Sequence, residues 1–106
     1  MDEKLKYLVG RVKEELVRRY GRGIDRVLLY GSQARGEAEE GSDIDLLVVV
    51  DESLDAREVR RSLNDLLLEI LLEEGELVSV IVVPRNTFDH YNSPLLVNIR
   101  REGVAV

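Results

Sequence analysis

The sequence predicts an α/β (α+β) domain in which a small mixed sheet is covered by helices. An amphipathic helical repeat opens the chain, short runs of Val, Ile and Leu alternate with helical segments after it, and no linker or repeat divides the 106 residues. A chain of this length suits one hydrophobic core, so we expect residues 1–106 to form a single domain. The expected order is helix, strand, short helical turn, strand, helix, strand, helix.

The first half of the chain is expected to give one long helix and two buried strands. Apolar residues recur every three or four positions over residues 3–20, and Gly21 follows where such a helix would end. The runs 24–30 and 44–50 are short, apolar and bounded by polar residues or glycine, which is typical of buried strands. The second run is almost purely Leu, Val and Ile, so we assign it to the centre of the sheet.

The second half is expected to give two helices around a third strand. Asp55 is the predicted N-cap of a helix over residues 56–74, which a glycine then closes. Residues 77–83 form another β-branched run, and the proline after it has no N–H to donate to a sheet. A Ser-Pro pair and a later glycine predict the last helix over residues 94–102.

Composition excludes several classes of protein. Without cysteine the chain cannot be a disulfide scaffold, a thiolate metal site or a cysteine-nucleophile enzyme, and this composition fits a reducing cytoplasm. No apolar run approaches the roughly 18 residues that cross a bilayer, so we expect no membrane partner. The net charge of −6 argues against a general nucleic-acid coat, and we expect no nucleic acid to be required. Residues 1–36 nevertheless carry +4 and residues 37–106 carry −10, which suits a site that binds a phosphate and a cation together.

The segment between the first two strands carries a candidate phosphate site. It reads Gly31-Ser32-Gln33-Ala34-Arg35-Gly36. A Gly-Ser turn after a strand directs backbone N–H groups and the serine hydroxyl toward a bound anion. If residues 32–36 form a helical turn, its positive end faces the same point, and Arg35 adds a fixed positive charge.

Two carboxylates lie in the segment Ser42-Asp43-Ile44-Asp45. Five residues separate this segment from the glycine-rich turn. On a strand Asp43 and Asp45 point to one face, with α-carbons about 6.6 Å apart. Two carboxylates this close repel each other unless a cation lies between them, and Mg²⁺ prefers oxygen ligands. Each feature alone is most often an ordinary turn or strand end, but their order and spacing indicate a site for a nucleotide and a metal.

The two segments together resemble the signature of the minimal nucleotidyltransferases, a family within the DNA polymerase β-like superfamily. The resemblance implies a nucleotidyltransferase fold and a Mg²⁺-dependent enzyme that moves a nucleotide from an NTP, with ATP expected, to a hydroxyl group. It implies that the glycine-serine pair contacts the triphosphate and that the two aspartates hold the metals. Our candidate nucleotide-binding residues are Gly31, Ser32, Arg35 and Ser42, and our candidate catalytic and metal-binding residues are Asp43 and Asp45.

The sequence departs from this family pattern at one position. Active members usually carry a third carboxylate on the next core strand, where this chain has Ser79. A hydroxyl is a poor replacement, so a first metal is expected to bind and the second metal of a two-metal site is in doubt. Glu76, before that strand, and Asp89, after it, are the alternatives that could supply the missing acid.

Two hypotheses about function therefore stay open. The first is an enzyme that transfers a nucleotide to a small molecule or to a partner protein, such as the other member of a toxin–antitoxin pair. The second is a catalytically weakened nucleotide-binding or antitoxin-type module that acts by contact. Family members are often encoded beside HEPN-domain proteins, so a HEPN-domain partner is expected by resemblance. A homo-oligomer is compatible with either hypothesis.

Overall fold

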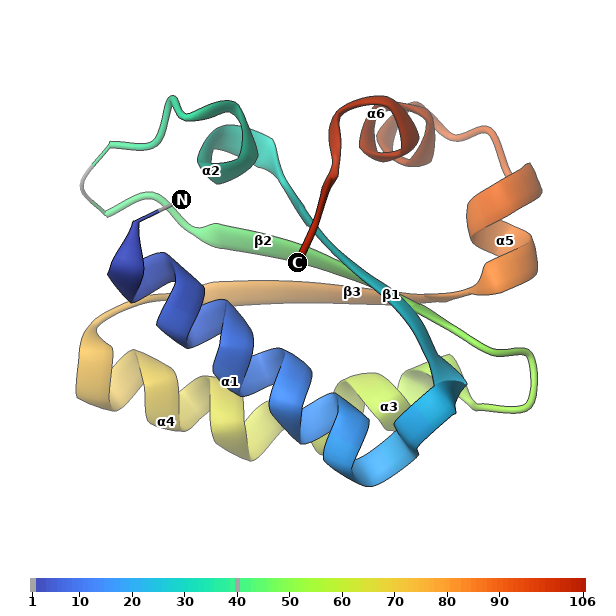
Figure 1. Ribbon diagram of the computed structural model, residues 1–106, viewed down its shortest axis with the longest axis horizontal. Helices are drawn as coiled ribbons and strands as arrows, with labels where there is room; N and C mark the ends of the chain where they lie inside the picture. Colours follow the sequence, from blue (N-terminus) through green and yellow to red (C-terminus); the bar gives the residue numbers. More distant parts are fainter. Residues whose placement is uncertain (1, 40) are drawn as a thin grey trace.

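A four-stranded mixed sheet with helices on both faces forms the structure (Figure 1). The computed structural model describes residues 2–39 and 41–106. The elements, in chain order, are α1 Glu3–Tyr20, a 3₁₀ turn Gly21–Gly23, β1 Ile24–Tyr30, α2 Gly31–Arg35, β2 Ile44–Val50, α3 Ala56–Ser62, α4 Asn64–Glu74, β3 Val78–Pro84, α5 Arg85–His90, α6 Pro94–Glu102 and β4 Val104–Ala105. The predicted mixed α/β class is therefore confirmed.

The strands lie in the order β3-β2-β1-β4, with β2 in the interior as the sequence predicted. Strand β1 runs antiparallel to both β2 and β4, whereas β2 and β3 are parallel. Because β2 and β3 are parallel and β1 is antiparallel to them, the end of β1 meets the starts of β2 and β3 at one end of the sheet. This end of the sheet carries the glycine-rich turn and Asp45, the aspartate of β2.

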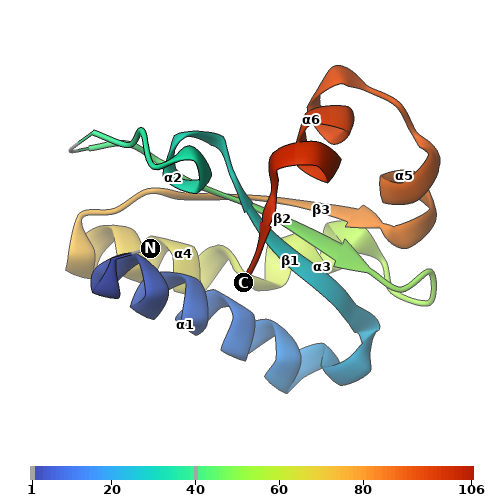
Figure 2. The same cartoon turned by 45° about the horizontal axis from the view of Figure 1, so that its top comes forward.

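Alternation along β2 divides the core into two layers. Its even-numbered residues, such as Leu46 and Val48, pack against α1, α3 and α4. Leu47 and Val49 point the other way and pack against residues of α5 and α6, including Phe88. The two views agree that α1, α3 and α4 lie on one side of the sheet and α2, α5 and α6 on the other (Figures 1 and 2).

The predicted helix over residues 56–74 is interrupted once. Leu63 separates α3 from α4, and its N–H bonds to the carbonyl of Arg60, three residues back. Helical backbone angles continue through this position, and the Leu67 N–H bonds to the Leu63 carbonyl at 2.9 Å. The apolar stripe is unbroken there, because Leu63 is fully buried. Leu71, expected on the same buried stripe, is 39% exposed, so that part of the prediction is wrong.

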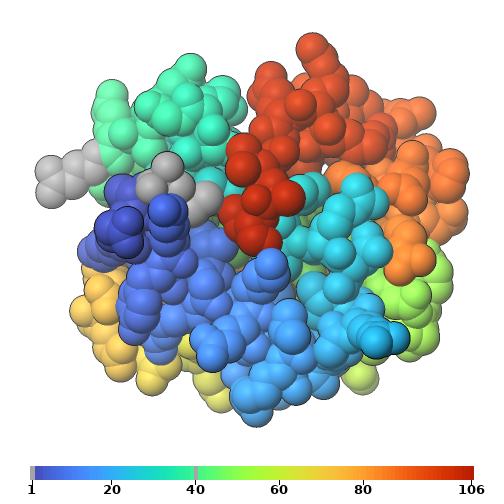
Figure 3. Space-filling view, viewed as in Figure 1, coloured from blue at the N-terminus to red at the C-terminus, as the bar shows by residue number. Residues whose placement is uncertain are grey.

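Two short elements were not predicted from the sequence. Helix α5 follows Pro84 directly, and Phe88 is its buried residue. Strand β4 pairs with Leu28 and Leu29 of β1, and the N–H of Val106 bonds to the Val27 carbonyl at 3.0 Å. Figure 3 shows this segment on the surface between α1 and α6. Strand β3 is shifted by one residue from the predicted 77–83 and includes the proline at its end.

One edge of the sheet is partly covered. Strand β3 has a neighbour only on its β2 side within the part of the chain that the structure describes. Arg60 reaches from α3 to this strand and donates from Nε to the Val80 carbonyl at 2.9 Å. No helix within residues 2–39 and 41–106 is long and apolar enough to cross a membrane.

Candidate active site

The glycine-rich segment forms a one-turn helix at the end of β1. The turn was predicted over residues 32–36, and α2 spans Gly31–Arg35. Gly36 ends it in the left-handed region, and the N–H of Glu37 bonds to the Ser32 carbonyl at 3.0 Å. The carbonyl groups at the C-terminal end of the turn therefore accept hydrogen bonds from within the segment. The first N–H groups of the turn have no acceptor within the helix.

Gly31 touches the carboxylate of Asp45. Its φ of +74° lies in the left-handed region, which glycine adopts without strain. A Cβ atom at this position would lie 2.6 Å from Oδ2 of Asp45, closer than any ordinary contact. The absence of a side chain at Gly31 thus brings the predicted phosphate turn and one predicted metal ligand into direct contact.

Asp45 lies between two strands that contribute one residue each to its surroundings. Tyr30 of β1 and Ser79 of β3 are its register partners. Paired residues on adjacent strands project to the same face, so all three side chains lie on the face that carries α6. Tyr30 was not predicted as a site residue, because nothing in its sequence context separates it from the apolar residues of its strand.

The surroundings of Asp45 and Tyr30 disfavour the charged forms of these two side chains. Burial, and then the charge of Asp43, raise the pKa of Asp45 above its usual range. Burial, and then the charge of Asp45, likewise raise the pKa of Tyr30. An ionised Asp45 is therefore stabilised by a positive partner, which is what a bound cation supplies.

Asp43 and Asp45 fit one divalent cation. Asp43 is exposed just before β2, Asp45 is partly buried at its second position, and both offer the oxygen atoms that Mg²⁺ prefers. The described ranges contain no group of three or more acidic or histidine side chains placed to hold a metal. The pair therefore offers ligands for one metal, and no third acidic ligand stands beside it in the part of the chain that the structure describes.

Neither alternative acid reaches this end of the face. Glu76 forms an ion pair with Lys4 of α1 at 3.4 Å, on the opposite layer of the sheet. Asp89 pairs with Arg26 at 3.2 Å, near the start of β1 and thus at the far end of the sheet. Ser79, in contrast, is in register with Asp45 and lies on the same face of the sheet, as expected if the two strands are neighbours. The strand position beside Asp45, where the family resemblance implies a third carboxylate, holds a hydroxyl.

The other two candidate residues have local contacts of their own. Arg35 donates from Nε to Glu37 at 3.0 Å and remains half exposed beside Gly31. The hydroxyl oxygen of Ser42 accepts from the N–H of Glu39 at 2.9 Å. Ser42 thus orders the loop that leads into Asp43, and its hydroxyl hydrogen remains available to a ligand.

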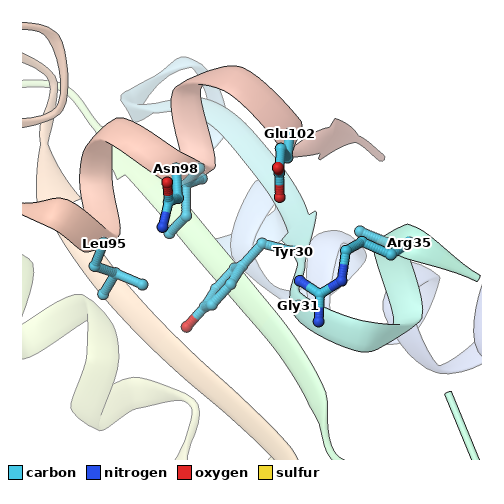
Figure 4. Close-up of a pocket in the computed structure, with 8 residues that line it drawn as sticks. Tyr30, Gly31, Arg35, Leu95, Asn98 and Glu102 are labelled. Carbon is cyan, nitrogen blue, oxygen red and sulfur yellow. The ribbon is translucent and has the colours of Figure 1, made fainter. Parts of the chain in front are cut away.

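A cavity of about 250 Å³ lies beside this turn, between α2 and α6 (Figure 4). Its lining residues are Tyr30, Gly31, Ala34, Arg35, Leu95, Asn98, Ile99 and Glu102. Half of them come from α6, which the sequence predicted as a helix without any role in the site. The only sequence signal for such a role is that Asn98 and Glu102 lie one helical turn apart, and a solvated helix face gives the same pattern.

The geometry brings the glycine-rich helical turn and the carboxylate pair Asp43 and Asp45 together at one end of the sheet of an α/β domain. Residues 9–104 match the nucleotidyltransferase domain family, and the chain belongs to that family. The chain is thus an enzyme of the nucleotidyltransferase class, and this family generally uses a divalent metal.

Two relatives from Methanocaldococcus jannaschii carry similar names. The chain is 35% identical to "Putative protein adenylyltransferase MJ1305" over 103 residues, which cover 93% of this chain and 69% of the relative. It is 32% identical to "Putative protein adenylyltransferase MJ0604" over 88 residues, which cover 83% of this chain and 78% of that relative.

Solved structures share the fold at lower identity. A nucleotidyltransferase structure from Sulfolobus solfataricus, described as putative, superposes with a TM-score of 0.60 at 19% identity, covering 96% of this chain and 78% of that one. A structure described as "the toxin-antitoxin with AMP-PNP" gives a TM-score of 0.59 at 18% identity, covering 90% and 69%. These likenesses confirm the predicted nucleotidyltransferase fold.

Proposed function

We propose that this chain is a Mg²⁺-dependent adenylyltransferase that moves AMP from ATP to a hydroxyl group of a partner protein. The contact between Gly31 and Asp45 carries the proposal, because it joins a phosphate-binding turn to a metal-binding carboxylate. The names of the two archaeal relatives support a protein as acceptor. The toxin–antitoxin structure with AMP-PNP supports an adenine nucleotide and a partner of the same kind, for which we propose a HEPN-domain protein.

The chain's own residues would bind and orient the donor. The N–H groups at the start of α2 and the hydroxyl of Ser32 would bind the β- and γ-phosphates, and Arg35 would add positive charge beside them. Asp43 and Asp45 would hold Mg²⁺, which supplies charge neutralisation on the phosphates. The acceptor oxygen forms a bond to the α-phosphorus, the bond from that phosphorus to the bridging oxygen breaks, and pyrophosphate leaves. The hydroxyl proton goes to solvent.

A second candidate function is a weakened nucleotide-binding module that acts on its partner by contact. The hydroxyl of Ser79 beside Asp45, where active relatives place an acid, favours it. This candidate shares the nucleotide site and the partner with the first but not the transfer step. Both candidates place the chain in the cytoplasm, where ATP and Mg²⁺ are present.

Labelling tests the first candidate. The chain is incubated with Mg²⁺, the protein encoded by the neighbouring gene and ATP labelled at either the α- or the γ-phosphate. Adenylyl transfer puts α-label but no γ-label on the partner, and the double variant Asp43→Asn with Asp45→Asn removes the α-label. Calorimetry should also show that this variant has lost Mg²⁺-dependent ATP binding. Unchanged binding in the variant contradicts the proposed site, and binding without any α-label leaves the contact module as the function.

A further inference from the structure

The cavity between α2 and α6 has a phosphate end and an apolar end. Gly31 and Arg35 line one end, next to the proposed phosphate turn. Figure 4 shows Glu102 above this end and Asn98 farther along α6, toward Leu95, with both polar side chains directed into the space between the helices. A ligand that enters from the phosphate turn therefore meets Glu102 first and Asn98 second.

From this arrangement we propose that the cavity is the nucleoside subsite, in which Glu102 selects ribose over deoxyribose and Asn98 selects adenine. The inference rests on the proposed triphosphate site. It adds a specificity that neither the motif nor the relatives assign to any residue.

The size and lining of the cavity suit a nucleoside. Its volume of about 250 Å³ is somewhat below the roughly 300–1,000 Å³ of pockets that enclose whole drug-sized ligands, so phosphates would lie outside it. The ring of Tyr30 lies across the cavity beneath α6, and Leu95 and Ile99 add apolar surface for a flat base. A mostly apolar lining with a few polar groups is the usual composition of a small-molecule site.

Glu102 is the residue that points to a sugar. It has no ion-pair partner within residues 2–39 and 41–106, and it stands beside a turn that is proposed to hold a triphosphate. A carboxylate there repels phosphate, but it accepts hydrogen bonds from ribose hydroxyls, as an acidic residue does in dinucleotide-binding folds. Removing the 2′-hydroxyl would remove a hydrogen-bond donor to Glu102.

Asn98 is placed to contact the base. It lies one helical turn before Glu102, on the side of the cavity away from the phosphate turn. Its amide offers one acceptor and one donor group, which match the exocyclic amine and an adjacent ring nitrogen of adenine. On the edge that carries N7, guanine offers two acceptors, O6 and N7, so the amide cannot make the same paired contact there.

Equilibrium binding measured by calorimetry tests this inference. The ligands are ATP, dATP, GTP and inorganic tripolyphosphate, each with Mg²⁺, and the proteins are the unmodified chain and the variants Glu102→Ala, Glu102→Gln and Asn98→Leu. We expect the unmodified chain to bind ATP about tenfold more tightly than dATP or GTP. Glu102→Ala should abolish the preference over dATP, Glu102→Gln should retain part of it, and Asn98→Leu should abolish the preference over GTP.

Tripolyphosphate separates this inference from the proposed function. It carries no nucleoside, so its affinity should be the same in the unmodified chain and in Asn98→Leu, and it reports any general effect of charge in the Glu102 variants. Glu14→Ala, which removes an exposed carboxylate from α1, is the matched control and should keep both preferences. Equal affinities for ATP, dATP and GTP, with tripolyphosphate still bound, overturn the inference and leave the proposed function standing. If no triphosphate binds at all, both are overturned.

Discussion

Gly31 is the residue whose identity the site constrains most strongly. Its φ of +74° favours glycine, and a Cβ atom there would lie only 2.6 Å from Oδ2 of Asp45, so two separate requirements exclude a side chain. Gly36 meets only the first, since its φ is +71° and a Cβ there would meet nothing within 4 Å. The two glycines therefore allow backbone strain to be separated from the contact with the carboxylate.

We expect Gly31→Val to lower Mg²⁺–ATP affinity more than tenfold and to destabilise the fold by about 1–3 kcal/mol through backbone strain. Gly36→Val should lose similar stability but keep most of the binding, because its side chain points into open space. Urea unfolding and calorimetry measure the two effects. Normal ATP binding by a folded Gly31→Val chain would place the phosphate turn elsewhere.

Asp45 is expected to lower the stability of the metal-free protein. Burial and Asp43 raise its pKa in the folded state, so the folded chain binds this proton more tightly than the unfolded chain does. Stability then falls as the pH rises from the ordinary aspartate pKa, about 4, through the raised value, and at neutral pH the full penalty is present.

Asp45→Asn should accordingly raise the melting temperature at pH 7 in a metal-free buffer. The gain should shrink as the pH falls and the carboxyl of the unmodified chain takes up its proton. Excess Mg²⁺ should reverse the order, because only the unmodified chain gains from binding the ion. Thermal unfolding with and without chelator measures this, and a variant that is less stable than the unmodified chain without metal contradicts the pKa direction.

At the scale of elements, one arginine links α6 to the segment before it. Arg100 donates to the carbonyls of Phe88 and Tyr91 and, at 2.5 Å, to the side chain of Asn92. These bonds join α6 to the end of α5 and to the loop between the two helices. The helix that forms one wall of the cavity is thus held by contacts outside the cavity.

Arg100→Ala should therefore affect both stability and ligand preference. We expect a loss of about 1–2 kcal/mol in the free energy of unfolding, as for hydrogen bonds made by a charged group, and a weaker preference for ATP over tripolyphosphate. Arg101→Ala is the control, because that neighbouring arginine is exposed and does not line the cavity. Equal stability of the two variants would show that Arg100 does not fix the helix.

Local signals predicted most of the elements. The bounds of α1, β1, β2 and α6 agree with the predicted ranges, because capping residues, glycines and apolar periodicity lie in the segments themselves. The break at Leu63 was missed because it leaves the apolar stripe unchanged. Strand β4 and helix α5 were missed for a different reason: β4 exists through pairing with β1, and α5 through burial of Phe88 against distant residues.

The residues of the candidate site likewise divide into those that local sequence signals predict and those that only the fold brings together. The motif residues were found because their spacing is a local property of the chain, and the strand alternation placed Ser79 beside Asp45. Asn98 and Glu102 were missed, since they become neighbours of the motif only when α6 folds over the sheet. Tyr30 precedes Gly31 in the sequence, but it meets Asp45 only when β1 pairs with β2. The spacing of these residues in the sequence does not predict that approach.

At the scale of the whole molecule, the chain lacks one acid on its active face. Asp43 and Asp45 fit a first metal, and the position in register with Asp45 holds a serine. A second metal would lack a protein ligand that helps to activate the acceptor. The isolated chain is therefore expected to bind Mg²⁺–ATP but to transfer slowly, well below the order of 1 s⁻¹ of ordinary enzymes.

Ser79→Asp should raise the transfer rate by at least about tenfold once an acceptor protein is supplied. Ser79→Asn, which has a similar shape and no charge, should leave it unchanged. Rates of pyrophosphate release measure the effect. Transfer by the unmodified chain at about 1 s⁻¹ or faster would show that the third acid is not needed.

The partly covered edge of the sheet bears on how the molecule meets its own copies. An unpaired strand rich in Val and Ile, such as β3, is a template on which identical strands of other chains can add and aggregate. Along a parallel strand, the backbone N–H and C=O groups of successive residues point alternately to its two sides. The residues of β3 whose backbone groups point away from β2 are therefore Val80 and every second residue from it. Arg60 donates a hydrogen bond to the carbonyl of Val80. Pro84, two positions beyond Val82 and on the same side of the strand, has no N–H to donate. Strand addition is thus blocked at two points along a seven-residue edge, which disfavours aggregation through this strand.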